Sequence, residues 1–259
     1  MRRVIIAILI ILALGAAWKA APFMNIIVAM IKNAPIKDTL VLNDFATTVG
    51  EKFVSCFIFS TGKGKVALVD AGVDPEGKAI LAALKRMGLE PESVEAIFLT
   101  HGDRDHTAGC RIFSQARIYC SQADKANAEG QANSYKIGGK LLPARDSGCR
   151  VTNILKDGQT IKLGKVQVKL YAVPGHTPGS MAFLAGGVLF MGDSANVARS
   201  GKLTGGSPLF TENPALNLAS LSSLARRLKS QEDNIKVIAC AHTGPAYGLK
   251  PLEDLAQAK

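Results

Sequence analysis

The amino-acid sequence predicts an α/β fold in which helices pack on the outer faces of two β-sheets. Three observations indicate this class. Strand-like and helix-like segments alternate over residues 53–130, β-like segments dominate residues 151–192, and a strand and a helix follow near the end. Elements in this order are typical of layered domains. With 259 residues, 47% of them hydrophobic and 20% charged, the chain suits one large domain with a short appendage.

The first half of the body alternates strand-like apolar runs with helix-like segments. The predicted strands cover residues 53–61, 65–72, 94–100 and 116–121, and the predicted helices cover residues 75–88 and 122–130. Gly62-Lys63-Gly64 is a typical turn between the first two strands. Pro75 and Gly88 mark the start and the end of the first helix.

The second half begins with predicted β-hairpins, whose turn signals are Asp157-Gly158, Gly164-Lys165 and Gly186-Gly187. The elements after them are a helix over residues 214–229, a strand over 234–242 and a short C-terminal helix. Two long connections cover residues 130–150 and 195–213. Connections of this length in a compact domain usually carry function, so we expect lids or substrate-binding segments there.

Residues 1–37 are predicted to be an N-terminal signal anchor or signal peptide with its linker, and residues 38–259 to be the catalytic domain. After Arg2 and Arg3, an apolar run covers residues 4–18, as in an export signal. The apolar stretch continues to Ile31, and as a helix it measures about 42 Å, enough to span a bilayer. The two arginines favour a cytoplasmic N-terminus, so the body is expected on the extracytoplasmic (periplasmic) side, membrane-anchored or exported.

The net charge of +10 is unevenly distributed along the chain. Residues 1–37 contain five basic and no acidic side chains, so they hold half of the net charge. The much longer body is therefore only mildly basic, which does not favour nucleic-acid binding. The expected partners are a small-molecule substrate and, through the N-terminal segment, a membrane.

The five cysteines are Cys56, Cys110, Cys120, Cys149 and Cys240, and no two of them form a C-x-x-C pair. A zinc finger or a thioredoxin-type motif is therefore not indicated. Cys56 and Cys240 lie in apolar strand-like runs and are expected to be small core residues. A Cys110–Cys120 or Cys110–Cys149 disulfide is an open alternative in an oxidising compartment.

All four histidines of the chain lie at the ends of strand-like segments. They occur in THGDRDHTAG (100–109), PGHTPGS (174–180) and AHTGP (241–245), and each of these segments opens a loop that contains Gly or Pro. Asp193, in LFMGDS, has the same placement. Functional sites of α/β proteins assemble where strands lead into loops. This pattern indicates a metal site rather than four unrelated histidines.

Imidazole and carboxylate groups are suitable ligands for divalent zinc, iron or manganese. A hydrolytic metal site also keeps a position for water, whose pKa falls to about 7 on the metal. The candidate metal ligands are His101, Asp103, Asp105, His106, His176, Asp193 and His242. Seven ligands are too many for one zinc ion and suit two divalent metals about 3.5–4 Å apart.

These motifs resemble the metallo-β-lactamase superfamily, whose signature H-x-H-x-D-H is followed by separate His, Asp and His ligands. Here the signature reads HGDRDH over residues 101–106, and the resemblance covers roughly residues 40–248. It implies a four-layer αββα sandwich with the metal site at one edge. LVDAG (68–72) resembles the strand-ending Asp motif of the family, which implies that Asp70 supports the site without binding metal.

The resemblance also implies the role of each ligand. One metal is expected on His101, Asp103 and His176, a second on Asp105, His106 and His242, with Asp193 bridging the two. Zinc is the expected metal, and Asp105 is the expected catalytic residue that orients the attacking hydroxide. The departure is Asp103, where the family usually has His. Because a carboxylate is a harder ligand than imidazole, iron or manganese stays an alternative.

The function that the resemblance implies is a hydrolase in which a metal-bound hydroxide cleaves an ester, thioester, lactone or lactam bond. Glyoxalase II proper is disfavoured, because it carries a C-terminal substrate domain and only 17 residues follow His242. The first alternative, raised by Asp103, is an iron-dependent redox enzyme of the diiron or persulfide-dioxygenase kind. The second is a membrane-tethered binding protein with a degenerate site. No substrate-binding residue is indicated.

Overall fold

The computed structural model describes residues 32–132, 134–137, 140–142, 144–229 and 235–258. Contacts divide the chain into two units, Met1–Asn33 and Ala34–Lys259, and the second unit contains the predicted domain. Most of the predicted signal segment, residues 1–37, lies outside the described residues and stays a prediction. Within the described ranges, no helix is both long and apolar enough to cross a membrane.

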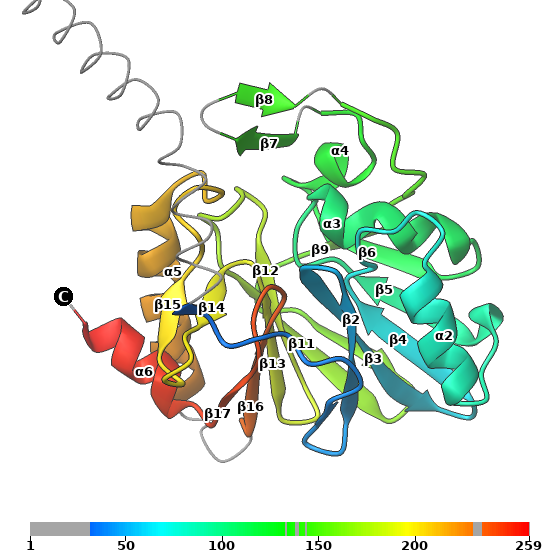
Figure 1. Cartoon of the computed structure of the whole chain (residues 1–259), viewed down its shortest axis with the longest axis horizontal. Helices are drawn as coiled ribbons and strands as arrows, with labels where there is room; N and C mark the ends of the chain where they lie inside the picture. Colours follow the sequence, from blue (N-terminus) through cyan, green and yellow to red (C-terminus); the bar gives the residue numbers. More distant parts are fainter. Residues whose placement is uncertain (1–31, 133, 138–139, 143, 230–234, 259) are drawn as a thin grey trace, which may run out of the picture. The chain divides into compact units, whose positions relative to one another are not determined.

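Two β-sheets form the centre of the second unit (Figure 1). Within the described residues, the first sheet has the strand order β1-β2-β3-β4-β5-β6-β9. Its strands are β1 (Val41–Leu42), β2 (Ala46–Glu51), β3 (Val54–Gly62), β4 (Lys65–Val69), β5 (Val94–Phe98), β6 (Arg117–Ser121) and β9 (Asn153–Leu155). In this sheet, the neighbouring strands β4, β5, β6 and β9 run parallel to one another. The neighbouring strands from β1 to β4 pair antiparallel.

The second sheet has the strand order β10-β11-β12-β13-β16-β17 in the same described part of the chain. Its strands are β10 (Thr160–Leu163), β11 (Val166–Ala172), β12 (Met181–Ala185), β13 (Val188–Gly192), β16 (Val237–Cys240) and β17 (Ala246–Tyr247). The two long connections carry small hairpins of their own. These are β7 (Ser134–Ile137) with β8 (Lys140–Leu142), and β14 (Ala195–Val197) with β15 (Leu203–Gly205).

Helices cover the outer faces of both sheets (Figure 1). The helices on the side of the first sheet are α2 (Lys78–Arg86), α3 (Arg104–Thr107), α4 (Lys125–Ala128) and the 3₁₀ helices η1 (Pro91–Ser93) and η2 (Ala108–Ile112). Those on the side of the second sheet are α5 (Pro214–Leu228) and α6 (Lys250–Gln257). The observed α2 begins after the predicted start, because Asp74 accepts backbone hydrogen bonds from Glu76 and Lys78 and holds a turn there.

The alternation of side chains along β3 explains the layers. Phe57 and Phe59 face the core between the two sheets, where their ring centroids lie 5.1 and 6.3 Å from that of Phe190 on β13. Cys56 and Ile58 point the other way, into the cluster under α2. A third apolar cluster lies between the second sheet and the helices α5 and α6. The predicted four-layer αββα sandwich is therefore confirmed.

One predicted hairpin is wrong. The chain does not fold back on itself at Asp157-Gly158, because β9 pairs with β6 in the first sheet and β10 pairs with β11 in the second. Asp157 lies where the chain crosses between the sheets, and its carboxylate accepts hydrogen bonds from the Ala172 backbone and from Arg227. The hairpins at Gly164-Lys165 and Gly186-Gly187 are confirmed.

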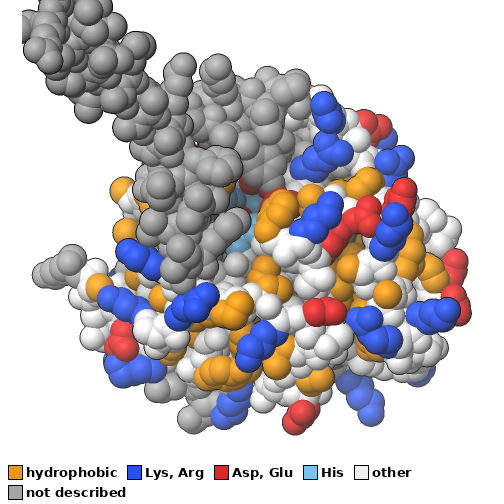
Figure 2. Space-filling model, in the orientation of Figure 1, with side chains coloured by type: hydrophobic (Ala, Val, Ile, Leu, Met, Phe, Trp, Pro, Cys, Tyr) orange, Lys and Arg blue, Asp and Glu red, His pale blue; other side chains and the backbone are white. Residues whose placement is uncertain are grey.

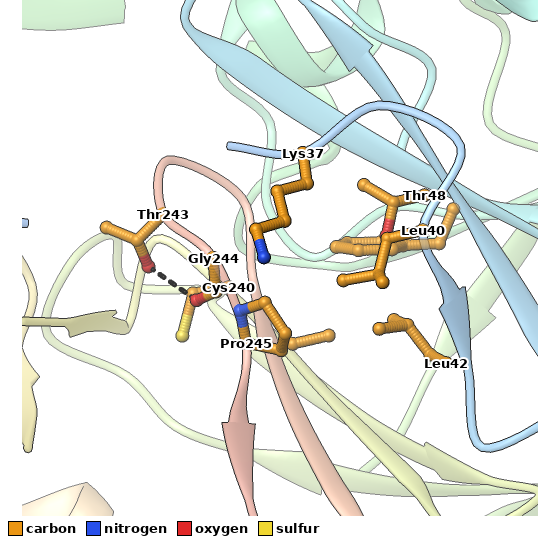
Figure 3. A pocket seen from close by; sticks show the side chains of 10 residues that line it. Lys37, Leu40, Leu42, Thr48, Cys240, Thr243, Gly244 and Pro245 are labelled. Atoms are coloured by element: carbon orange, nitrogen blue, oxygen red, sulfur yellow. Dashed lines mark hydrogen bonds between the residues drawn. The ribbon is translucent and has the colours of Figure 1, made fainter. Parts of the chain in front are cut away.

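The five cysteines are all buried and free, so neither disulfide alternative is present. Near Cys240, a small pocket lies between the first strands and the β16–β17 loop, with Lys37, Leu40 and Pro245 among its lining residues (Figure 3). Its volume is about 10 Å³, which is room for about one water molecule. This pocket is therefore too small to hold a substrate.

Candidate metal centre

The candidate ligands follow the carboxyl ends of strands that run in one direction within each sheet. In the first sheet, β5 leads to His101. In the second sheet, β11, β13 and β16 lead to His176, Asp193 and His242. These three strands share one direction, because β12 is antiparallel to both β11 and β13, and β16 is parallel to β13. Carboxyl ends of parallel strands meet at the same edge of a sheet. Loops from both sheets can therefore bring these side chains together.

Short helix α3 carries the remaining ligands of the first loop. Asp103 is the residue immediately before α3, in an extended conformation, and Asp105 and His106 lie on the helix itself. All three side chains are buried. The change from extended chain to helix lets neighbouring residues of this segment contribute to two different groups of ligands.

The first group is formed by His101, Asp103 and His176. Their ligand atoms lie within 4.8 Å of one another. The Asp103 Oδ2 atom lies 3.4 Å from the Nε2 atoms of both His101 and His176. Asp103 thus takes a place between two imidazoles, which is the arrangement expected of a metal ligand.

The second group is formed by Asp105, His106 and His242, whose ligand atoms also lie within 4.8 Å of one another. The Asp105 Oδ2 atom is 3.4 Å from His242 Nε2 and 3.7 Å from His106 Nε2. Both groups therefore consist of two imidazoles and one carboxylate.

Asp193 faces both groups. Its Oδ1 atom lies 3.1 Å from His106 Nε2, and its Oδ2 atom lies 3.0 Å from His242 Nε2 and 3.7 Å from His176 Nε2. A carboxylate between two sets of ligands can bridge two metal ions. All seven residues predicted from the sequence are thus brought together at one edge of the sandwich.

Unpaired polar atoms show that this ligand set fits divalent cations. The Nε2 atoms of His101, His106 and His176 and the Oδ1 atom of Asp193 are buried and have no hydrogen-bond partner among the described residues. Buried polar atoms without a partner are rare because they are costly. Cations shared by these atoms would satisfy all of them at once, and the mixture of imidazole and carboxylate suits zinc, iron or manganese.

The other ring nitrogen of each histidine is held by the protein. His106 Nδ1 lies 2.9 Å from Asp70 Oδ2, and His242 Nδ1 lies 2.7 Å from the Phe53 carbonyl oxygen. Both partners accept, so Nδ1 carries the proton and Nε2 keeps its lone pair for the centre. His101 Nδ1 lies 3.0 Å from the Thr100 hydroxyl.

Asp70 occupies the end of β4 in a left-handed conformation, with φ of 59°. Besides His106, its carboxylate accepts hydrogen bonds from the backbone N–H and the hydroxyl of Thr100, both at 2.8 Å. It lies beside an imidazole ligand, on the far side from the other carboxylates. These contacts place Asp70 next to the centre, and the supporting role that the resemblance implies stays a prediction.

Charge strongly couples these side chains. Burial raises the pKa of the Asp103 carboxyl, but the imidazoles of His101 and His176 outweigh burial and lower it. Burial lowers the pKa of the His242 imidazole, but the Asp193 carboxylate and its neighbours raise it to about 10. Without metal, the carboxylates are therefore ionised and His242 holds a proton that a metal ion must displace.

Asp124 is a residue that the sequence did not single out. It lies between β6 and α4, is buried, and accepts hydrogen bonds from the backbone N–H of Gly102 and Gly179, both at 3.0 Å, and from the hydroxyl of Thr177 at 2.6 Å. These donors lie in the loops of His101 and His176. The only sequence signal was the position of Asp124 after a strand, which many aspartates share.

The centre opens to solvent on the side of His242. Its side chain is 26% exposed, whereas that of His101 is 1% exposed. The Phe53 ring lies nearly parallel to the His242 ring, with centroids 6.0 Å apart, and is 48% exposed. Figure 2 shows histidine side chains reaching the surface at one place on this face of the molecule. His242 is therefore the most exposed of the seven candidate ligands.

The chain has relatives among known proteins. The family model described as the metallo-β-lactamase superfamily matches residues 49–242. The chain is 30% identical over 194 residues to a hydroxyacylglutathione hydrolase of Serratia proteamaculans, which covers 75% of this chain and 63% of that protein. It is 33% identical over 174 residues to a protein of the same name from Dechloromonas aromatica, covering 67% and 54%. The chain thus spans less than two thirds of the length of these relatives.

Solved structures agree on the fold. A metallo-β-lactamase of Cronobacter sakazakii aligns with a TM-score of 0.59 at 22% identity, covering 80% of this chain and 74% of that one. A metallo-β-lactamase family protein of Thermus thermophilus aligns with a TM-score of 0.57 at 22% identity, covering 82% and 77%.

Proposed function

This chain belongs to the metallo-β-lactamase superfamily, and from that premise we propose that it is a metal-dependent hydrolase of an ester-like bond, with thioesters as the first substrate class. The sequence relatives favour thioesters, because the hydroxyacylglutathione of their name is a thioester. Oxygen esters, lactones and lactams have the same kind of electrophilic carbonyl and belong to the substrate range to be tested.

The observation that carries the proposal is the position of Asp193 between the two ligand groups. Its two oxygens lie 3.1 and 3.0 Å from the Nε2 atoms of His106 and His242, and 3.7 Å separates it from His176. Such a carboxylate can hold two divalent ions close enough to act on one substrate. When bound, divalent ions lower the pKa of water and stabilise negative charge developing on the substrate oxygen.

The protein's own groups supply orientation and proton handling. Asp105 lies near the open side, with its Oδ2 atom 3.4 Å from His242 Nε2, and we assign to it the orientation of the attacking water through a hydrogen bond. Asp70 and the Phe53 carbonyl hold the His106 and His242 rings in the tautomer that the centre needs. Phe53 offers an apolar surface where the acyl group enters.

A second candidate function is an iron-dependent redox reaction. It is favoured by one observation: each ligand group consists of two histidines and one carboxylate, with Asp103 in the first and Asp105 in the second. This donor set is also the one that non-haem iron(II) enzymes use. The same structure therefore supports either metal, and the metal content decides.

The test combines metal analysis with substrate assays. Full-length protein purified without chelator is analysed by mass spectrometry for zinc, iron and manganese, then assayed with an acyl-glutathione thioester, a lactone and a β-lactam, and for oxygen consumption. Two zinc ions with thioester turnover support the proposal, whereas iron with oxygen consumption supports the second candidate. Protein that contains no metal and turns over no substrate would contradict both candidate functions and would favour a non-catalytic binding protein.

The matched variants for this test are His106→Ala and Lys165→Ala. His106 is fully buried in the centre, whereas Lys165 is exposed in the turn between β10 and β11. We expect His106→Ala to lose metal and turnover and Lys165→Ala to keep both. Full turnover in His106→Ala would contradict the assignment of the site.

A further inference from the structure

The Asp103 carboxylate has a partner outside the ligand set. While its Oδ2 atom faces the first ligand group, its Oδ1 atom accepts a 2.8 Å hydrogen bond from the side-chain amide of Asn127 on α4. We propose that Asn127 is a positioning residue that fixes Asp103 as a ligand through one oxygen, and so allows an aspartate where the family usually has histidine. The proposal rests on the metal centre of the proposed function and not on its substrate.

A carboxylate needs such a partner more than an imidazole does. Its two equivalent oxygens can both approach a cation, and rotation of the group exchanges them. A hydrogen bond from Asn127 to Oδ1 occupies one oxygen and leaves Oδ2 pointing at His101 and His176. Hydrogen-bonding partners behind metal ligands are known to orient them and to tune affinity.

The chemistry of an amide suits this role. The Asn127 amide is neutral, so it orients Asp103 without cancelling the negative charge that a cation needs. A lysine or arginine in the same place would compete with the metal for that charge. The amide cannot be reversed at this contact either, because its oxygen would then face the carboxylate oxygen of Asp103.

The fold brings Asn127 to Asp103 through a close approach of backbone segments. Asp124 and α4 pack against Gly102, where an added Cβ atom would lie 2.7 Å from the Asp124 carbonyl oxygen and 2.8 Å from the Asn127 Cβ atom. The Gly102 N–H donates to the Asp124 carboxylate at 3.0 Å. The loop of His101 and Asp103 is therefore held directly against the helix that carries Asn127.

The decisive experiment is a double-mutant cycle between Asn127 and residue 103. Zinc affinity of each site is measured by competition with a chromophoric chelator, in wild type, Asn127→Leu, Asp103→His and the double variant. We expect Asn127→Leu to weaken zinc binding at the first group by about 10–100-fold in the wild-type background. In the Asp103→His background no second carboxylate oxygen needs a partner. There, the loss of zinc affinity caused by Asn127→Leu should be at least fivefold smaller than in the wild-type background. In cobalt(II)-substituted Asn127→Leu, the absorption bands of the first group should change and those of the second group should not.

A control and a second variant separate positioning from folding. Lys125→Ala, at the first residue of α4, removes the 3.1 Å ion pair with Glu129 just after the helix and the 3.2 Å hydrogen bond to the Val151 carbonyl oxygen, and should change zinc affinity less than about twofold. Asn127→Ser withdraws the amide with a smaller side chain and serves if Asn127→Leu does not fold. Unchanged affinity in the Asn127 variants would overturn the proposal, and so would equal losses in both backgrounds. Coupling between residues 103 and 127 without thioester turnover would overturn only the proposed function.

Discussion

The Asp124 carboxylate accepts a 2.6 Å hydrogen bond from the Thr177 hydroxyl, and this contact ties the two loops of the first ligand group together. The same carboxylate accepts from the backbone of Gly102, next to His101, and of Gly179, close to His176. Because the two loops come from different sheets, Asp124 helps to fix the distance between two ligands that are far apart in the sequence.

Replacing Asp124 should therefore affect both stability and metal binding. Asp124→Ala leaves three buried donors without their acceptor, which we expect to cost about 3 kcal/mol or more in free energy of unfolding. Chemical denaturation measures this cost, and chelator competition should show weaker zinc binding. Asp157→Ala is the matched control: Asp157 also accepts from a backbone N–H and from Arg227, but it is exposed, so a loss of only about 1 kcal/mol is expected. Equal losses in the two variants would contradict this role of Asp124.

Gly179 is expected to be irreplaceable because of space. An added Cβ atom would lie 2.1 Å from the Ser121 Oγ atom and 2.6 Å from Asp124 Oδ1. Gly179→Ala must push the His176 loop away from Asp124, which we expect to lower the free energy of unfolding by about 1–3 kcal/mol. Thermal unfolding measures the loss of stability, and site-resolved zinc competition measures the affinity of each ligand group. Zinc affinity should fall more at the first group than at the second.

The control for this prediction is Gly50→Ala, whose nearest neighbour would be the Ile36 Cγ2 atom at 3.2 Å. That contact can relax, so the variant should retain zinc affinity. Gly179→Ala with wild-type stability and zinc affinity would show that the loop is not held as tightly as these distances indicate.

The candidate ligands, which the structure brings together, could be located from the sequence, because metal chemistry restricts the residue types and their segments follow strand-like runs. His176 and His242 are easy to find for this reason. Asn127 and Asp124 could not be found in the same way. Their side chains act across a close approach between α4 and a loop more than twenty positions earlier, and a polar residue on a short helix has many possible roles.

Two further features depend on tertiary structure in ways that a local pattern does not record. The partner of His242 Nδ1 is the carbonyl oxygen of Phe53, and every residue has such an oxygen. The turn signal at Asp157-Gly158 indicates a change of direction, but not that the two adjoining strands join different sheets. The αββα layers, by contrast, follow from the alternation of apolar side chains along strands such as β3.

Asp70→Asn should weaken the second ligand group. The Asp70 carboxylate accepts from three donors, two on Thr100 and one on His106, whereas an amide has only one oxygen. At least one donor then faces the amide NH₂ group, and His106 Nδ1 faces either that group or a neutral oxygen, which accepts more weakly than a carboxylate. We expect zinc affinity of the second group to fall by about 10–100-fold, measured by chelator competition. Asp74→Asn, in an exposed turn of the same loop, should leave affinity unchanged, and a similar loss there would point to a general effect on folding.

Zinc binding should strengthen as pH rises, because the metal displaces protons from imidazoles. The carboxylates of Asp193 and Asp105 overcome burial and raise the pKa of His242 to about 10, and the pKa of His106 is also raised. At neutral pH, His242 is therefore protonated in the metal-free protein. Each proton released makes the apparent affinity about tenfold higher per pH unit, or ~1.4 kcal/mol. Calorimetry in two buffers of different ionisation enthalpy should show buffer-dependent heats at pH 7.

The same groups predict how the metal-free protein responds to pH. A raised imidazole pKa adds stability that is complete below the unfolded value of about 6.5 and is lost as pH rises through about 10, the folded value of His242. The lowered carboxyl pKa values of Asp103 and Asp193 add stability above about pH 3.8 that is lost on further acidification. The increase in melting temperature caused by zinc should therefore grow from pH 6 to pH 9. An increase that shrinks over this range, together with buffer-independent heats, would show that the imidazoles are already neutral before the metal binds.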